Sequence, residues 1–439
     1  MSSCTSLLSA LRAGVHDKPL AALYALDGTQ ASLDLARDRA CRAVRSLESA
    51  FSPAENACAV LFSGPGRTEI GGNHTDHQHG HVLCGSVDMD MLACAAPNGK
   101  NLIRIQSEGY PALEVDLDDL SVKPEESNTS AALVRGVASG IRKLGYSLRG
   151  FDACVTSTVL SGSGLSSSAA YEVLIGNILN RFCCGGALDC VQIAKIGQFA
   201  ENVYFGKPCG LMDQMGSSVG GAVAIDFADP ADPVVKRAGY DFSKSGYTLC
   251  ILDTASSHGD LTGDYADITL EMGAVAAYFG KTVLREVPEA EFRAVLPALR
   301  EQCGDRAVLR ALHFYADDRR AVQEAQALEG GDFSRFLDLV NASGLSSELH
   351  LQNAWSAASP RQQAIPMALA RARELLDGEG AARVHGGGFA GTIQAFVPDG
   401  KLGAFRSGME ELFGPGRCHV LHIRPQGGCT VAPSEQSTL

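Results

Sequence analysis

The chain has 439 residues, of which 45% are hydrophobic and 20% charged, and its formal net charge is −13. This composition is typical of a globular protein with a sizeable core, and about 150 residues per domain predicts two or three domains. An acidic surface repels polyanions, so we expect no nucleic-acid partner, although a local nest of backbone N–H groups can still bind phosphate.

Residues 1–55 carry apolar residues at three- and four-residue spacing, which predicts helices. Short apolar runs follow, which predict strands, and residues 102–107 and 113–117 alternate apolar and polar residues as half-buried strands do; the first strand is expected to run into a Gly-Pro-Gly turn at 64–66. Before residue 161 we expect strands at 60–62, 82–84, 91–95, 102–107, 113–117 and 151–160, and one helix at 132–144.

The second half of the chain is richer in helical patterns, and a domain boundary is plausible near 230–245. Because strands and helices mix without strict alternation, the predicted class is α+β. We expect helices at 165–182, 191–204, 265–278, 289–299, 306–328, 333–340, 365–376 and 405–413, with strands at 223–227, 247–252, 392–397 and 418–423.

The 14 cysteines are scattered without a Cys-x-x-Cys pair, which in a long chain favours reduced thiols over a disulfide framework. Residues 1–14 lack the apolar stretch of a signal peptide, and no run approaches the roughly 20 apolar residues of a membrane span. We therefore expect a cytoplasmic protein without a membrane partner.

The central motif is Ser161-Gly-Ser-Gly-Leu-Ser-Ser-Ser-Ala-Ala-Tyr-Glu, between a predicted strand and a predicted helix. Glycines let a backbone approach a ligand closely, and a helix start offers unpaired N–H groups to phosphate. The serine hydroxyls can bind phosphate oxygens or Mg²⁺. The alternative without a ligand is a helix cap made of small residues. A Walker A loop is excluded because no Lys follows Gly164, so the run predicts a different kind of phosphate loop.

A second motif, residues 64–81, reads Gly-Pro-Gly-Arg-Thr-Glu-Ile-Gly-Gly-Asn-His-Thr-Asp-His-Gln-His-Gly-His. Its side chains suit a sugar pocket, in which many hydroxyls need hydrogen-bond partners. Two alternatives stay open from the residues alone: a zinc site built on His74, His77, His79 and His81, whose spacing matches no usual zinc pattern, or a solvated polar loop.

Two further motifs are less specific for one function when each is considered alone. Arg383-Val-His-Gly-Gly-Gly-Phe-Ala-Gly-Thr predicts a tight hairpin or a loop that presses its backbone onto a ligand. The stretch 199–216 holds Glu201 near a helix end and Asp213 after a Pro/Gly turn. With a phosphate loop nearby, one acid can hold Mg²⁺ while the other faces an acceptor hydroxyl.

Together and in this order the four stretches resemble the GHMP kinases, and within them the galactokinase family. The family signature Pro-Gly-Arg-Val-Asn-Leu-Ile-Gly-Glu-His-Thr-Asp-Tyr reads Pro-Gly-Arg-Thr-Glu-Ile-Gly-Gly-Asn-His-Thr-Asp-His at 65–77. The Gly-x-Gly-Leu-Ser-Ser-Ser-Ala motif is matched at 162–169, the Pro-Cys-Gly-Ile-Met-Asp-Gln stretch at 208–214, and the late Gly-Ala-Gly-Phe-Gly-Gly loop at 386–391.

This resemblance implies an α+β fold of two domains, a ribosomal-protein-S5-like α/β domain and then a ferredoxin-like α+β domain. On this basis residues 1–55 form a helical extension, residues 56–240 the first domain and residues 241–439 the second. The implied activity is ATP- and Mg²⁺-dependent phosphorylation of the anomeric hydroxyl of galactose, by a monomer or weak homodimer.

The resemblance also implies a role for individual positions. Asp213 falls on the catalytic aspartate and Arg67 on its partner, while Ser168 and Glu201 fall on the Mg²⁺ positions. The expected ATP contacts are Gly162, Ser163, Gly164, Leu165, Ser166, Ser167 and Ser168. The expected sugar contacts are Asn73, His74, Asp76, Gly210, Asp213 and Tyr265.

Several departures from the family pattern bear on the substrate. Asn73 stands where the family has a sugar-binding Glu, and Glu69, His77 and His385 replace Asn, Tyr and Thr. Asn is uncharged and can donate as well as accept hydrogen bonds. Galactose is therefore the first expectation, with galacturonate, arabinose and N-acetylgalactosamine as alternatives. A non-catalytic sugar sensor is a second hypothesis, and a zinc hydrolase on the histidine loop a third.

Overall fold

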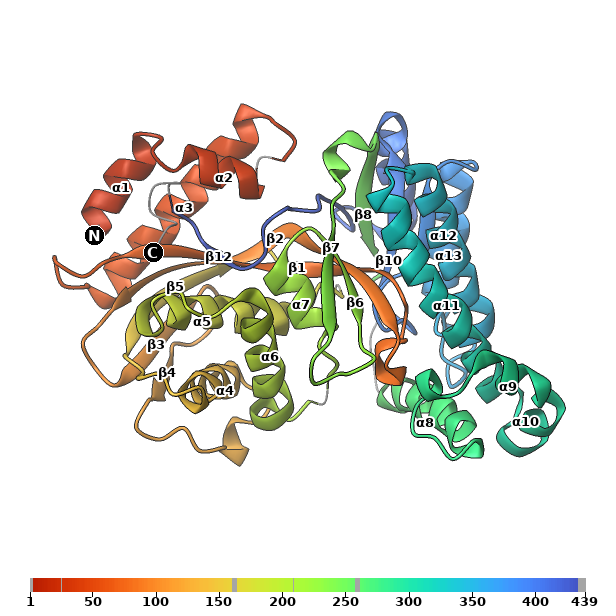
Figure 1. The fold of residues 1–439 in the computed structure, drawn as a ribbon. Helices are drawn as coiled ribbons and strands as arrows, with labels where there is room; N and C mark the ends of the chain where they lie inside the picture. Colours follow the sequence, from red (N-terminus) through yellow and green to blue (C-terminus); the bar gives the residue numbers. More distant parts are fainter. Residues whose placement is uncertain (1–2, 25, 160–163, 208, 257–260, 433–439) are drawn as a thin grey trace.

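The computed structural model describes residues 3–24, 26–159, 164–207, 209–256 and 261–432 (Figure 1). Its strands are β1 (Val60–Gly71), β2 (His81–Pro97), β3 (Leu102–Ser107), β4 (Leu113–Asp116), β5 (Phe151–Ser157), β6 (Ala222–Asp226), β7 (Val234–Ala238), β8 (Tyr247–Asp253), β9 (Ala381–Val384), β10 (Thr392–Pro398), β11 (Cys418–Leu421) and β12 (Cys429–Thr430). Its α-helices are α1 (Cys4–Arg12), α2 (Asp17–Tyr24), α3 (Gln30–Phe51), α4 (Ser130–Lys143), α5 (Ser167–Cys183), α6 (Cys190–Ala200), α7 (Met212–Val219), α8 (Thr262–Tyr278), α9 (Glu289–Ala294), α10 (Leu296–Cys303), α11 (Asp305–Glu329), α12 (Phe333–Ser346), α13 (Ala364–Leu376) and α14 (Leu402–Phe413).

The first sheet has the strand order β12-β1-β2-β5-β3-β4, and β6 and β7 extend it along the far end of β2. Among the described pairs only β3 and β5 run parallel. The last strand, β12, follows the whole second half of the chain and returns to pair with β1, with Thr430 opposite Phe62. Residues more than 350 positions apart thus complete one sheet.

Both faces of the first sheet are covered by helices. Alternate residues of a strand point to opposite faces, and in β2 Leu92 and Cys94 pack under α1–α3 whereas Ala93 and Ala95 pack under α4–α6. Figure 1 shows these two helical layers on either side of the sheet. The strands are consequently apolar on both faces, which explains why their sequence shows runs of apolar residues rather than clean alternation.

The second sheet has the order β11-β8-β10-β9, and all its described neighbours are antiparallel. Helices α13 and α14 pack against it around Ile393 and Phe405. Helices α11 and α12 pack on the β1–β2 side as well, so the core around Phe336 and Phe396 also includes Leu83 and Val87 of the first sheet. The N-terminal part of β1 therefore packs in the core of the first sheet, whereas its C-terminal part packs in the core that both sheets share.

Several predicted elements differ from the structure. The expected Gly-Pro-Gly turn is part of β1, which bulges between Pro65 and Arg67; Gly64 is needed there because a Cβ would lie 2.3 Å from the carbonyl oxygen of Ala170 in α5. The helix expected at 289–299 is divided into α9 and α10, with Pro297 in the first turn of α10. Helix α7 and strand β7 were not expected.

The remaining expectations about the chain concern its thiols, its membrane behaviour and its domains. All 14 cysteines are free thiols, and Cys84, Cys94 and Cys250 are among the buried ones. Among the described residues no helix is both long and apolar enough to cross a bilayer. The domain boundaries stay a prediction, with β12 of the first sheet lying at 429–430.

Candidate active site

An ion pair between Arg67 of β1 and Asp213 of α7 lies at the centre of the site. The Arg67 Nε and Nη2 atoms donate to Asp213 Oδ1 at 2.8 and 2.6 Å. The other carboxylate oxygen, Oδ2, accepts from the hydroxyl of Ser166 at 2.5 Å. Arg67 also donates to the carbonyl of Gly164 through Nη1. Two predicted catalytic residues are thus in contact with each other and with the predicted phosphate loop.

The electrostatics keep the Asp213 carboxylate ionised. Burial alone would raise its pKa, but the charge of Arg67 and the hydrogen bond from Ser166 hold the pKa of Asp213 below its ordinary value. Its side chain is 26% exposed whereas that of Arg67 is 7% exposed. The arginine is therefore a fixed buried partner, and the carboxylate is the member of the pair that a ligand can reach.

Helix α7 places Asp213 in its first turn, where the helix dipole favours a negative side chain. The sequence suggested only a turn after Pro208, because Gly216, Ser217 and Ser218 are poor helix formers. Packing outweighs this weak propensity: Met215 is fully buried, and Ser217 donates through Oγ to the carbonyl of Pro65 at 2.6 Å.

The described part of the phosphate loop runs from Gly164 to Ser168 and enters α5. Gly162 and Ser163 lie outside the described residues. Ser166 adopts a left-handed backbone conformation, φ 55°, at the helix start, an uncommon and costly conformation for a non-glycine residue. The Leu165 carbonyl accepts from the Arg67 backbone N–H at 3.1 Å. The first backbone N–H groups of α5 have no partner within the helix, and they follow directly after Ser166, which contacts Asp213.

The predicted metal residues are also in contact. Ser168 donates through Oγ to Glu201 Oε1 at 3.0 Å, and Lys207 Nζ lies 3.4 Å from the same oxygen. Gln214, the neighbour of Asp213, donates to Glu201 Oε2 at 2.8 Å. A hydroxyl beside a buried carboxylate is a donor set that suits Mg²⁺, which prefers oxygen ligands. These residues therefore fit the metal that the family resemblance implies.

A second buried carboxyl supports Glu201 from behind. Glu172 of α5 is fully buried and shares the Gln214 Nε2 donor, at 3.0 Å. Burial and the charge of Glu201 raise the pKa of Glu172 well above its ordinary value, which favours the protonated carboxyl. Sequence analysis missed Glu172 and Gln214 as parts of this group, although both stand inside motifs that it quoted.

The predicted sugar residues His74, Asp76, Gly210 and Tyr265 lie near the loop at 386–391, called the glycine loop below, and near the start of α7. His74 Nε2 lies 3.0 Å from the carbonyl of Gly387, and Tyr265 donates through its hydroxyl to the carbonyl of Gly388 at 3.0 Å. A Cβ on Gly210 would lie 2.4 Å from Asp76 Oδ2, so these two predicted residues lie next to each other.

Burial lowers the pKa of His74 to about 4, so its imidazole is neutral at physiological pH. A neutral imidazole can donate from one ring nitrogen and accept on the other. His74 can thus bind a hydroxyl group without adding charge to its surroundings.

Asn73, one of the expected sugar contacts, lies in the interior of the protein. Its side chain is fully buried, and both amide atoms are hydrogen-bonded to protein groups. The role of Asn73 as a sugar contact therefore stays a prediction, and what the structure shows is a side chain held between β1, the loop at 386–391 and the chain after α12.

Two other departures from the family pattern are also buried. Glu69 accepts from Arg383 Nη2 at 3.1 Å, which forms an ion pair between β1 and β9. His385 lies beside the phosphate loop: its Nε2 is 3.1 Å from Thr68 Oγ1, and a Cβ on Gly164 would lie 3.0 Å from its Nδ1. The motifs at 64–81, 161–172 and 383–392 therefore meet at one place.

The histidines outside the site have other partners. His81 lies between Asp318, at 3.0 Å from Nδ1, and Asp226, at 3.2 Å from Nε2, and Arg285 contacts both carboxylates. Within the described ranges no three His, Cys, Asp or Glu side chains are grouped as a metal site requires. The structure thus offers the zinc alternative no ligand cluster in that part of the chain.

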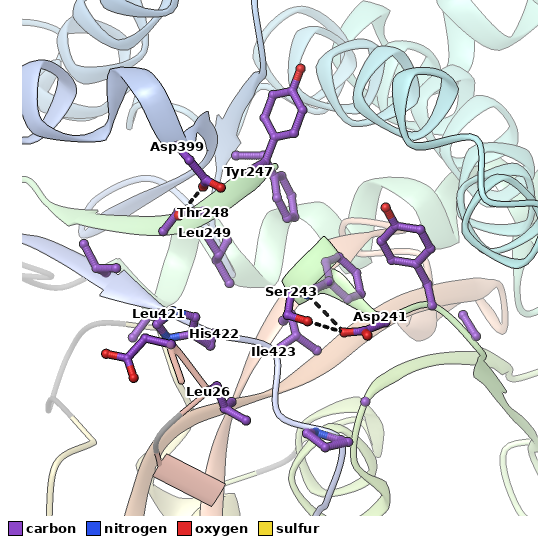
Figure 2. A pocket seen from close by; sticks show the side chains of 18 of the residues that line it. Leu26, Asp241, Ser243, Tyr247, Thr248, Leu249, Asp399, Leu421, His422 and Ile423 are labelled. Carbon is purple, nitrogen blue, oxygen red and sulfur yellow. Dashed lines mark hydrogen bonds between the residues drawn. The ribbon is translucent and has the colours of Figure 1, made fainter. Parts of the chain in front are cut away.

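A cavity of about 970 Å³ lies elsewhere, between the α2–α3 link, the segment after β7 and the second sheet (Figure 2). Apolar side chains such as Phe242 and Leu421 line it, and Thr248 donates to Asp399 at its edge. Of the predicted site residues that the structure describes, none lines this cavity. Chemical grouping, and not cavity size, identifies the active site.

Comparisons with known proteins agree with the fold. The family description "GHMP kinases N terminal domain" matches residues 132–221, and the "Galactokinase galactose-binding signature" matches residues 48–97. A galactokinase of Streptomyces coelicolor is 31% identical over 355 residues, which cover 80% of this chain and 88% of the relative.

Solved structures show the same fold at lower identity. The galactokinase of Lactococcus lactis, solved in complex with galactose, superposes with a TM-score of 0.73 at 22% identity over 88% of this chain and 97% of its own. The mevalonate kinase of Methanococcus jannaschii gives 0.59 at 13% identity over 83% and 98%. The two-layered arrangement of helices and sheets is therefore the GHMP kinase fold, and the chain belongs to the galactokinase family.

Proposed function

We propose that this chain transfers the γ-phosphoryl group of ATP to the anomeric hydroxyl of galactose, giving galactose 1-phosphate and ADP. The observation that carries the proposal is the contact of Arg67 and Ser166 with the two oxygens of Asp213 at the start of α5. This contact places an ionised acid for the acceptor hydroxyl beside a helix start for the donor phosphates.

Asp213 has the role of orienting the sugar hydroxyl and accepting its proton. Phosphoryl transfer depends mainly on positioning and charge stabilisation, because its transition state is loose. Arg67 holds one carboxylate oxygen, and Ser166 holds the other, so the carboxylate has a fixed direction. The Arg67 charge also offsets negative charge on the transferring group.

Ser168 and Glu201 would hold Mg²⁺, whose charge, when bound, neutralises phosphate oxygens. Glu201 is only 1% exposed, and Gln214 fixes one of its oxygens, so the other is directed toward Ser168. The raised pKa of Glu172 disfavours a second buried negative charge at the same amide. The backbone N–H groups that open α5 would bind the phosphates of ATP.

His74, Asp76 and Tyr265 supply the polar groups for the sugar, beside Asp213. The similar proteins named galactokinase favour galactose over galacturonate, arabinose and N-acetylgalactosamine. A panel of these four sugars, assayed by coupled ADP release with ATP and Mg²⁺, distinguishes them. We expect the highest kcat/KM with galactose.

A non-catalytic sugar sensor is the alternative function, and the retained Arg67–Asp213 pair argues against it. The variant Asp213→Asn keeps the size of the side chain but removes the charge, and we expect it to fold normally and lose nearly all turnover. The matched control is Asp232→Asn, whose side chain is 88% exposed. Near-parental turnover in Asp213→Asn, or none with any sugar in the parent, contradicts the proposed function.

The cellular setting is part of the same proposal. Fourteen free thiols are typical of a reducing compartment, which supports a cytoplasmic enzyme. We place it there as a monomer or weak homodimer, with ATP and a small sugar as its partners and with neither nucleic acid nor membrane.

A further inference from the structure

The amide of Asn73 connects three separate segments of the chain. Its Nδ2 donates to Glu69 Oε1 at 2.6 Å and to the carbonyl of Gly386 at 2.9 Å. Its Oδ1 accepts from Asn353 Nδ2 at 2.7 Å and from Ser347 Oγ at 3.2 Å. An amide has two donor and two main acceptor positions, and all four are filled by β1, the glycine loop and the chain after α12.

The partners fix which way the amide points. A carboxylate and a backbone carbonyl only accept hydrogen bonds, so the NH₂ group must face Glu69 and Gly386. A carboxylate at position 73 would direct an oxygen at these two acceptors. It would also place a second buried negative charge beside Glu69, which already forms an ion pair with Arg383.

The backbone of Asn73 is held as firmly as its side chain. Its N–H donates to Asp317 Oδ2 at 2.9 Å, and its carbonyl accepts from His313 Nε2 at 2.9 Å, both from α11. The next residue is His74, whose ring contacts the carbonyl of Gly387. Position 73 therefore determines how the His74 ring meets the glycine loop.

The opposite side of the same loop carries Tyr265. A Cβ on Gly387 would lie 2.5 Å from the Tyr265 ring, and Asn353 Nδ2, which contacts Asn73, also donates to the Gly387 carbonyl at 3.1 Å. A shift of the loop therefore moves His74 and Tyr265 relative to each other.

We infer that Asn73 is a positioning residue that holds the glycine loop between His74 and Tyr265, and that its amide is matched to the carboxylate of Glu69. The 69–73 pair accommodates only one carboxylate. The assignment of His74 and Tyr265 to the sugar rests on the proposed function, whereas the pairing of Asn73 with Glu69 does not.

The test is a double-mutant cycle of Asn73→Asp, Glu69→Gln and the double variant, with KM for galactose, KM for ATP and thermal stability measured for each. Asn73→Asp exposes one oxygen to two acceptors, and we expect KM for galactose to rise about tenfold or more, because an unpaired buried polar group costs about 1.4 kcal/mol or more. KM for ATP should change by less than about twofold.

The double variant should recover part of the loss, because the introduced amide at position 69 can donate to the introduced carboxylate at 73. The Gly386 carbonyl still faces an oxygen, so recovery should be incomplete. Asn180→Asp is the control for a purely structural effect: this buried amide bonds only to Leu188 in the described structure, at the far end of α5. It should lower stability without raising KM for galactose selectively.

Ser347→Ala is a milder variant in case Asn73→Asp does not fold. It removes only the 3.2 Å bond to Asn73, and we expect KM for galactose to rise about two- to fivefold. An unchanged KM for galactose in this variant, or equal rises for both substrates in Asn73→Asp, would overturn the inference. Strictly additive stability losses in the cycle would also overturn it, even if the parent phosphorylates no sugar and the proposed function fails.

Discussion

The buried carboxylate of Asp90 joins the N-terminal helices to the first sheet, and its charge is the most direct test of that attachment. Asp90 is fully buried in β2 and accepts from Tyr24 Oη at 2.6 Å and Arg39 Nη1 at 2.5 Å, both from the N-terminal helices. Ser63 of β1 also donates to it, and Arg424 Nη1 lies 3.6 Å away. The perturbation is Asp90→Asn, which preserves shape and removes the charge.

The structure indicates that the loss of stability in Asp90→Asn lies near the lower end of the range for a broken buried ion pair. Removing one member of a buried ion pair destabilises by about 3–5 kcal/mol, because the other charge stays buried. Arg39 retains the carbonyls of residue 90 and Thr156, and Arg424 retains two carbonyls of its own segment. We therefore expect the free energy of unfolding to fall by about 3 kcal/mol.

The dependence on pH gives the sign of the effect. Burial alone would raise the pKa of Asp90, but the charges of Arg39 and Arg424 hold it below its ordinary value. The stabilisation is therefore fully present above about pH 4, the unfolded pKa, and is lost as the pH falls through the folded pKa. The difference in unfolding free energy between the parent and Asp90→Asn should therefore shrink as the pH falls.

Urea unfolding followed by circular dichroism at pH 7, and again at acid pH, measures both quantities. Asp232→Asn is the control, because the aspartate is exposed and its partner Lys195 is partly exposed, and surface pairs contribute about 0–1 kcal/mol. A loss below about 1 kcal/mol in Asp90→Asn at pH 7 would refute the reasoning.

Three further predictions follow from the site and its surroundings. Ser166→Ala removes the 2.5 Å donor to Asp213, and steady-state kinetics should show kcat lower by about ten- to a hundredfold with an unchanged melting temperature. Gly387→Ala forces the Tyr265 ring to move, so KM for galactose should rise while KM for ATP stays constant. Glu324 has no hydrogen-bond partner for its carboxyl among the described residues, and burial raises its pKa well above the ordinary value. Its contribution to stability is therefore present below the unfolded pKa and lost as pH rises, so in thermal unfolding Glu324→Gln should become more stable than the parent with increasing pH.

The local parts of the site could be predicted from the sequence because each lies within one motif. The Gly164–Ser168 run stands between a strand and a helix, and the order of the motifs identified Asp213 and Arg67 as partners, which the 2.6 Å ion pair confirms as a contact. The helices of the extension were also predicted, from their periodicity, and most strands from short apolar runs.

The rest depends on contacts between distant residues, which no local pattern contains. Asn73 matches a family position for sugar binding, yet its partners at 313, 347 and 386 turn it into the interior. Helix α7 forms where propensity is low, because its buried face packs on β1 and β2. Asn353 stands in no motif and gave no signal, although it contacts both Asn73 and the glycine loop.

Because Phe62 pairs with Thr430, the first sheet cannot be completed before the ribosome has made residue 430. A ribosome adds roughly 5–20 residues per second, so β1 emerges many seconds before its outer neighbour has been made. During that interval the edge of β1 at Phe62 has open N–H and C=O groups, which other chains can pair with. A truncation before residue 429 would make that temporary edge permanent, and aggregation during synthesis would be its first sign.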